Sequence, residues 1–122
     1  MRLRLGLVVV ALTVAVMIPA SARRPVGVAL AQEVTEKALL DNERLMMIEF
    51  VFPAGFKGEE HAAVADEFAY VLEGEFAVVT KGQGKRVLRK GEVEYASKGT
   101  IHYSLNETKK PARVLVVLLK GR

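Results

Sequence analysis

Two stretches that begin with glycine decide the fold: residues 55–74 read GFKGEEHAAVADEFAYVLEG, and residues 91–106 read GEVEYASKGTIHYSLN. Each contains β-favouring side chains, turn residues and one of the two histidines of the chain, His61 and His102. Short strands separated by glycine-centred turns are typical of β-sandwiches and β-barrels. The two stretches therefore predict an all-β domain.

The same pattern continues on both sides of these stretches. The sequence predicts seven short strands, at residues 45–52, 67–72, 75–81, 85–90, 92–96, 101–106 and 114–119. The last of them is continuously apolar, as expected of a strand that is buried on both faces. Residues 35–41 form the one segment that is compatible with a short helix.

The first 31 residues have the character of an export signal and leader. Arg2 and Arg4 precede an apolar run at residues 5–18, which Pro19 and small residues follow. A basic start, a short apolar run and small residues before a cleavage point describe a secretory signal peptide. We expect cleavage after Ala22 or Ala31, followed by a domain at residues 34–122. An uncleaved membrane anchor is the alternative, although spanning a bilayer takes about 20 apolar residues.

The charge of the mature chain is balanced if cleavage follows Ala31, and it is +2 if cleavage follows Ala22 and leaves Arg23 and Arg24. All 14 acidic residues follow residue 31, whereas four of the 18 basic residues precede it, so 14 of each sign remain. Nucleic-acid binding requires a basic patch on the folded domain, and this balance predicts no nucleic-acid partner. A local basic run at residues 81–90 is interpreted as a solvated sheet edge, where Lys and Arg discourage edge-to-edge pairing. After cleavage we expect no stable membrane insertion.

Both histidines lie where strand alternation can direct polar groups into the barrel. Side chains two residues apart on a strand share a face, so Glu67 is expected to face the same side as Ala69 and Val71. By the same rule His102 shares a face with Ser104. A carboxylate and two imidazoles that point into one barrel suit a divalent transition metal, although two histidines and a glutamate alone are not specific.

The first stretch has a characteristic internal spacing. Five residues separate Gly55 from His61, three separate Ala63 from Glu67, and six separate Glu67 from Gly74. The second stretch also has a characteristic spacing. Five residues separate Gly91 from the turn at residues 97–99, two separate that turn from His102, and three separate His102 from Asn106.

This pair of spacings resembles the two motifs of the cupin family. The resemblance covers residues 55–106 and implies a double-stranded β-helix, the jelly-roll barrel of cupins. In metal-binding cupins three motif histidines and the motif glutamate are the ligands. Carried over to this chain, they imply His61, Glu67 and His102 as metal ligands, with Ala63 at an empty ligand position. Ser97 replaces a turn proline of the second motif.

The resemblance leaves two functions open. One is an exported, periplasmic or secreted cupin that binds Fe, Mn, Ni, Cu or Zn and a small organic molecule, with dioxygenase-like activity as the most natural reaction. Glu59 could then assist the site, and Ala63, Ala69, Val71 and Ser104 would line the ligand pocket. The other is a metal-free, non-catalytic barrel in which both histidines are packed and hydrogen-bonded. Related cupins commonly pair through their sheets, so we also expect a homodimer, with residues 45–52 at the interface.

The export signal makes a direct prediction. N-terminal sequencing of the protein recovered from outside the cytoplasm should begin near Arg23 or Gln32, because signal peptidase cuts after small residues behind the apolar run. A membrane-free mature protein that retains Met1 would contradict the prediction.

Overall fold

The apolar C-terminal segment forms the middle strand of a sheet. The computed structural model describes residues 33–121, and in it β9 (Ala112–Leu119) pairs antiparallel with β2 (Leu45–Phe52) on one side and with β4 (Asp66–Glu73) on the other. The predicted export signal and both cleavage points lie outside the described residues. Within residues 33–121 no helix is long and apolar enough to cross a membrane.

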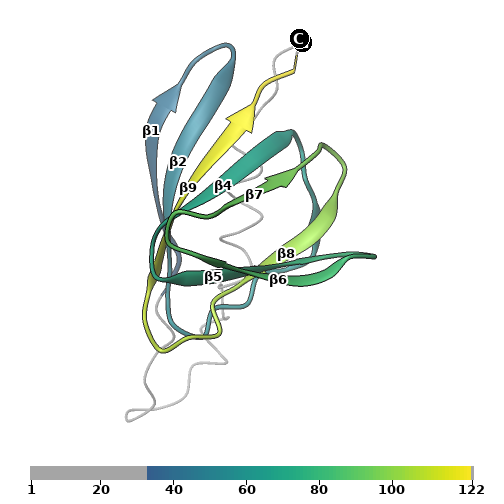
Figure 1. Cartoon of the computed structure of the whole chain (residues 1–122). Coiled ribbons are helices and arrows are strands. Elements are labelled where there is room, and N and C mark those ends of the chain that lie inside the picture. The colour runs from purple at the N-terminus through teal and green to yellow at the C-terminus, as the bar shows by residue number, and fades with distance from the viewer. Residues whose placement is uncertain (1–32, 122) are drawn as a thin grey trace, which may run out of the picture.

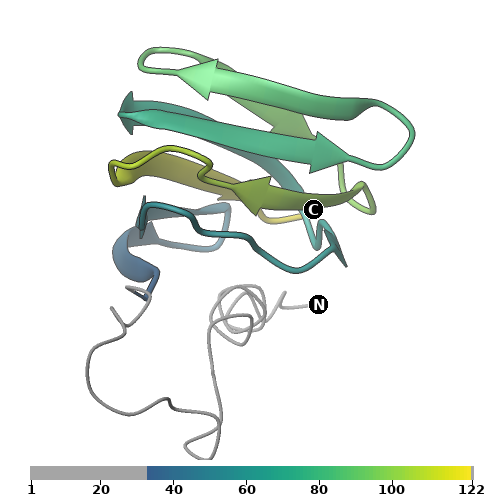
Figure 2. The ribbon, with the colours of Figure 1, turned by 90° about the horizontal axis from the view of Figure 1, so that it is seen from below.

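Two antiparallel sheets form an open jelly-roll barrel (Figure 1), which confirms the all-β fold class. The larger sheet has the strand order β1-β2-β9-β4-β7, and the smaller one has the order β3-β8-β5-β6, which Figure 2 shows from below. The remaining strands are β1 (Thr35–Asp41), β3 (His61–Ala62), β5 (Glu75–Thr80), β6 (Gly84–Arg89), β7 (Val93–Ala96) and β8 (Ile101–Leu105).

The core lies between the two sheets and is rich in phenylalanine. Alternate residues of β2 point inward, so Ile48, Phe50 and Phe52 are almost fully buried. The Phe52 ring lies between its neighbours, with centroid distances of 5.2 Å to Phe56 and 4.9 Å to Phe76. Such offset aromatic contacts stabilise a core beyond the burial of their surface, and here they join strands of both sheets.

The structure corrects two sequence predictions. Residues 35–41 form strand β1 and no helix, because Thr35–Asp41 pairs antiparallel with β2. A seven-residue helix would be marginal by itself, whereas β2 offers backbone partners along its whole edge. Residues 114–119 are not buried on both faces: Val114 and Leu118 face the core, but Leu119 is 37% exposed on the outer face.

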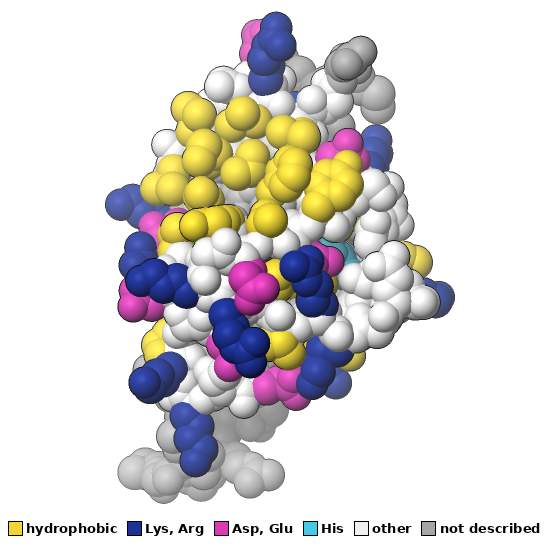
Figure 3. Space-filling model, viewed as in Figure 1, with side chains coloured by type: hydrophobic (Ala, Val, Ile, Leu, Met, Phe, Trp, Pro, Cys, Tyr) yellow, Lys and Arg dark blue, Asp and Glu magenta, His cyan; other side chains and the backbone are white. Residues whose placement is uncertain are grey.

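That outer face of the five-stranded sheet carries an apolar patch. Cross-strand partners share a face, so the register places its members together: Leu40, Met47, Phe68, Tyr70, Val93, Tyr95, Leu115, Val117 and Leu119. Six of the nine are 37–52% exposed, and Figure 3 shows apolar side chains gathered in the upper part of this face. Large exposed apolar patches mark protein interaction sites.

Asn106 holds the loop after β8 in place. Its amide donates hydrogen bonds to the backbone oxygens of Phe52 at 3.1 Å and Lys110 at 2.8 Å. Its side-chain oxygen accepts hydrogen bonds from the backbone N–H and the hydroxyl of Thr108. Asn106 is completely buried, so this residue of the second motif has a structural role.

We predict that Asn106→Ala lowers the free energy of unfolding by about 2–4 kcal/mol, because the buried carbonyl of Phe52 loses its side-chain donor and the N–H of Thr108 loses its side-chain acceptor. Thermal or denaturant unfolding measures the loss. Asn42→Ala is the matched control, since Asn42 accepts two backbone hydrogen bonds in the exposed turn before β2. Equal losses for the two variants would contradict the assignment.

We also expect a homodimer through the apolar patch. Six of its side chains are more than one third exposed, and pairing this face with a second copy would remove their apolar surface from water. Light scattering should give the mass of two chains, and Phe68→Lys or Tyr95→Lys should give one. Val87→Lys is the control, because Val87 is as exposed as Phe68 but lies on β6 of the other sheet. A wild-type monomer at micromolar concentration would exclude this interface.

Candidate functional site

A mainly apolar cavity lies between the two sheets. Its volume is about 40 Å³, and since one water needs about 10–15 Å³, it accommodates about three waters or a small chemical group. The apolar part of the wall is formed by Ile48, Phe50, Phe52, Ala69, Phe76, Val78, Ala96, Val116 and Leu118. The polar part is formed by His61, Glu67, Glu94, His102 and Ser104.

The two histidines meet across a pair of short strands. His61 on β3 is the direct cross-strand partner of His102 on β8, and their ring centroids are 4.8 Å apart. His102 is only 7% exposed. The loop that leads into β3 is attached to β8, because Gly58 donates to the backbone oxygen of Ser104. This attachment positions His61 next to His102.

Glu67 and His102 face each other from opposite sheets. Glu67 lies on β4, and its Oε1 is 3.2 Å from His102 Nε2, with side-chain exposures of 16% and 8%. The two atoms are close, but their geometry does not form a hydrogen bond, so Nε2 is a buried nitrogen without a hydrogen-bond partner. Among residues 33–121 it is the one such side-chain atom. Buried polar groups are nearly always satisfied, which makes this nitrogen a candidate ligand atom.

The tautomer of His61 follows from its surroundings. Its Nδ1 lies 3.0 Å from the backbone oxygen of Glu59. A carbonyl oxygen only accepts hydrogen bonds, so Nδ1 carries the proton and Nε2 keeps its lone pair. Metal-binding histidines commonly use this arrangement, in which the second ring nitrogen is held by a carbonyl. Glu59 therefore contacts His61 through its backbone, and its side chain is exposed.

The donor set suits a divalent metal in chemistry, and two of its members are suitably spaced. Two ligand atoms that each lie about 2.0–2.2 Å from one ion are about 3.0–3.5 Å from each other. The separation between Glu67 Oε1 and His102 Nε2, 3.2 Å, is in this range. Within residues 33–121 no three His, Cys, Asp or Glu side chains already have the arrangement that holds an ion. His61 lies beside the pair and would have to approach it to become the third ligand.

The other predicted pocket residues divide into two groups. Ala69 and Ser104 line the cavity. Val71 is fully buried in the hydrophobic core but is not part of the cavity wall. Ala63 is buried as well but is not among the residues that form the cavity wall. Its N–H donates to the carbonyl of Thr100 and its carbonyl accepts from the N–H of Gly99, which continues the pairing of His61 with His102 and of Ala62 with Ile101. Ala63 therefore keeps the parity of His61.

Glu94 is a cavity residue that the sequence analysis missed. It lies on β7, directly opposite Ala69 of β4, and only 16% of its side chain is exposed. The residues on either side of it, Val93 and Tyr95, are exposed. Hydrophobicity places Glu94 wrongly, because a glutamate between two apolar residues predicts that the glutamate faces solvent and its neighbours face the core. The available indication was that Glu94 lies two residues before Ala96 and therefore shares its face of the strand.

Comparisons with known proteins agree with this architecture. The sequence matches the family described as "Cupin domain" over residues 48–118. The structure is similar to that of KdgF from Halomonas sp., with 26% identity, a TM-score of 0.66 and coverage of 73% of this chain and 80% of that one. It is also similar to an RmlC-like cupin from Shewanella frigidimarina NCIMB 400, with 25% identity, a TM-score of 0.64 and coverage of 73% and 78%.

A cupin superfamily protein from Desulfitobacterium hafniense DCB-2 extends the agreement over more of the fold. The structural match covers 85% of this chain and 95% of the Desulfitobacterium protein, at 22% identity and a TM-score of 0.67. No curated protein matches the sequence. The family match extends across both sheets, and the two motif histidines lie side by side in the barrel. The chain therefore belongs to the cupin family.

Proposed function

We propose that this protein is an exported cupin that binds a divalent transition metal through His61, Glu67 and His102, and a small organic molecule in the cavity beside it. The observation that carries the proposal is the buried Nε2 of His102, which has no hydrogen-bond partner although Glu67 lies 3.2 Å away. Leaving a buried donor or acceptor unsatisfied costs about 1–3 kcal/mol. A metal ion between the two groups would remove that cost.

Each ligand would be supported by the fold. The Glu59 carbonyl holds the proton of His61 on Nδ1 and leaves Nε2 for the ion. Glu67 and His102 come from different sheets, so the ion would also join the two layers. Two histidines and one carboxylate leave coordination positions open, as in non-haem iron oxygenases. A bound ion would act as a Lewis acid and, if redox-active, would support dioxygenase-like oxidation.

The cavity selects the ligand by size and polarity. With about 40 Å³ of space and a wall of phenylalanine and aliphatic side chains, it admits a small group and excludes most water. Ser104 adds a hydroxyl that can donate or accept a hydrogen bond. Glu67 and Glu94 are the wall carboxylates that could take up a proton from a bound molecule. These features favour a small molecule with one polar end.

A second candidate function is a metal-free barrel that binds a small ligand without catalysis. Two observations favour it: no three donors within the described residues are already arranged for an ion, and alanine occupies position 63, where the family motif has a histidine. In this case Glu67 would serve His102 as a charged neighbour when the imidazole is protonated.

The metal proposal is tested by thermal unfolding of the chelator-stripped protein with Mn, Fe, Ni, Cu or Zn. We expect a stabilisation that grows with metal concentration and reaches about 2.7 kcal/mol at one hundred times Kd. His102→Gln and Glu67→Gln should abolish it, because each removes one of the two closely spaced ligands.

Glu73→Gln is the matched control for Glu67→Gln, since Glu73 is exposed at the other end of the same strand. It should respond to metal as the wild type does. If no metal stabilises the wild type at millimolar concentration, or if His102→Gln responds equally, the metal-free function is the correct one.

A further inference from the structure

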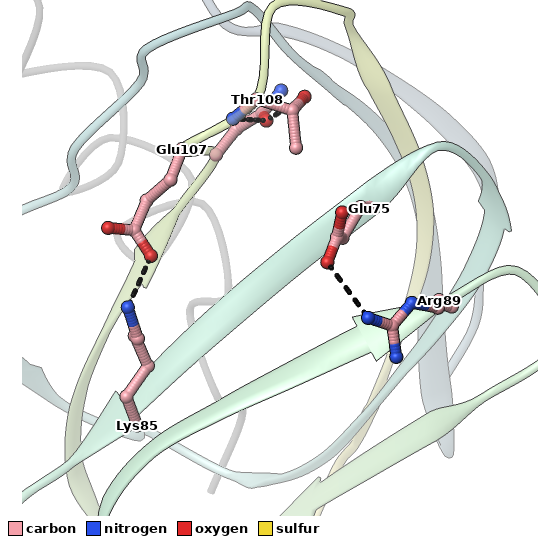
Figure 4. A network of polar contacts seen from close by, with 6 residues as sticks. Glu75, Lys85, Arg89, Glu107 and Thr108 are labelled. Atoms are coloured by element: carbon pink, nitrogen blue, oxygen red, sulfur yellow. Dashed lines mark hydrogen bonds and ion pairs between the residues drawn. The ribbon is translucent and has the colours of Figure 1, made fainter.

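The basic hairpin strand β6 carries two kinds of cation. Lys85 and Arg89 lie on its outer side, where they approach Glu107 at 2.6 Å and Glu75 at 3.7 Å (Figure 4). Arg86 has the opposite parity, which it shares with the fully buried Leu88. Alternation therefore directs Arg86 to the inner side of the sheet, although 54% of its side chain stays exposed at the solvated edge that the sequence predicted for the run.

Arg86 meets a carboxylate of the cavity wall. Its guanidinium nitrogen is 2.5 Å from Oε2 of Glu94, and the two side chains are 54% and 16% exposed. β6 is an edge strand of the smaller sheet, and β7, which carries Glu94, is an edge strand of the larger one. The ion pair thus bridges the two sheets at strands that have no further pairing strand among residues 33–121, and it places a solvent-accessible cation next to the cavity.

The cavity is short of positive charge. Among the described residues, its wall includes two glutamates and no lysine or arginine. Arg86 is in contact with the wall through Glu94 and is already oriented to bind a carboxylate. Guanidinium–carboxylate pairs are strong and geometrically specific, and a carboxylate of a ligand offers Arg86 the same contact that Glu94 provides.

We propose that Arg86 is the anion-binding residue of this cavity, and that the carboxylate of a small organic acid replaces Glu94 on its guanidinium. The inference deepens the proposed function, on which it rests, by naming the substrate class. Glu67 and Glu94 are diagonal neighbours on paired strands, about 7–8 Å apart. An acid held by Arg86 therefore needs only a few carbon atoms to reach Glu67 and His102.

The role of Glu94 makes the inference specific. It is an internal competitor for the guanidinium, so removing its charge should tighten anion binding. If the ion pair only joins the two sheets, Glu94→Gln should not tighten anion binding, because it would loosen the cavity and create no binding site.

The experiment uses acetate as the probe and acetamide as its neutral counterpart. Both are titrated into the full mature protein in the presence of chelator, and the Nε–H resonance of Arg86 is followed by NMR. We expect the wild type to bind acetate weakly and acetamide not at all. Glu94→Gln should bind acetate at least tenfold more tightly, and Arg86→Gln should lose the acetate response at the remaining cavity resonances.

Glu49→Gln is the matched control. It frees Arg113, which pairs with Glu49 at 2.7 Å on the outer face of the larger sheet, and acetate should bind there much more weakly than at Arg86 in Glu94→Gln. Equal affinities at the two arginines, or no gain in Glu94→Gln, would overturn the proposal. Because the titration is done without metal, its failure and the failure of the metal titration are read separately.

Discussion

The antiparallel register of β9 between β2 and β4 determines the rest of the structure. β9 pairs with β2 along eight residues, from Leu45↔Leu119 to Phe52↔Ala112, and with β4 on its other side. Since side chains alternate, a slip of one residue would turn every inward side chain outward. The observed register brings Phe50, Val114 and Val71 into the core, and on β4 it turns Glu67 toward the cavity.

The cavity depends on both sheets in different ways. The larger sheet contributes the two glutamates, and the smaller sheet contributes both histidines and Ser104. Asn106 connects the layers at the end of β8, because it hydrogen-bonds to the backbone of Phe52 in β2. The backbone of the site is therefore held by strand pairing and one buried amide, and the Glu94 side chain is held in addition by its ion pair with Arg86. This arrangement suits a site whose donors must converge on one small volume.

The open edges of the two sheets explain why charged residues lie close to an apolar cavity. Edge strands expose unpaired backbone groups, and charged side chains on them prevent pairing with other chains. On β6 the outward Lys85 and Arg89 serve this purpose with their glutamate partners. The inward Arg86 uses the same strand to reach Glu94 across the opening. One basic segment thus contributes both to the solubility of the edge and to the electrostatics of the cavity.

The sequence alone predicted the all-β class and most of the strands, because alternation is a local property of the chain, and its resemblance to the cupin motifs implied His61, Glu67 and His102, which line one cavity. It did not determine β1, whose strand conformation depends on the free edge of β2. The inward positions of Glu94 and Arg86 also required the tertiary structure. Their ion pair joins edge strands of different sheets, and only the closure of one sheet over the other brings these two residues together.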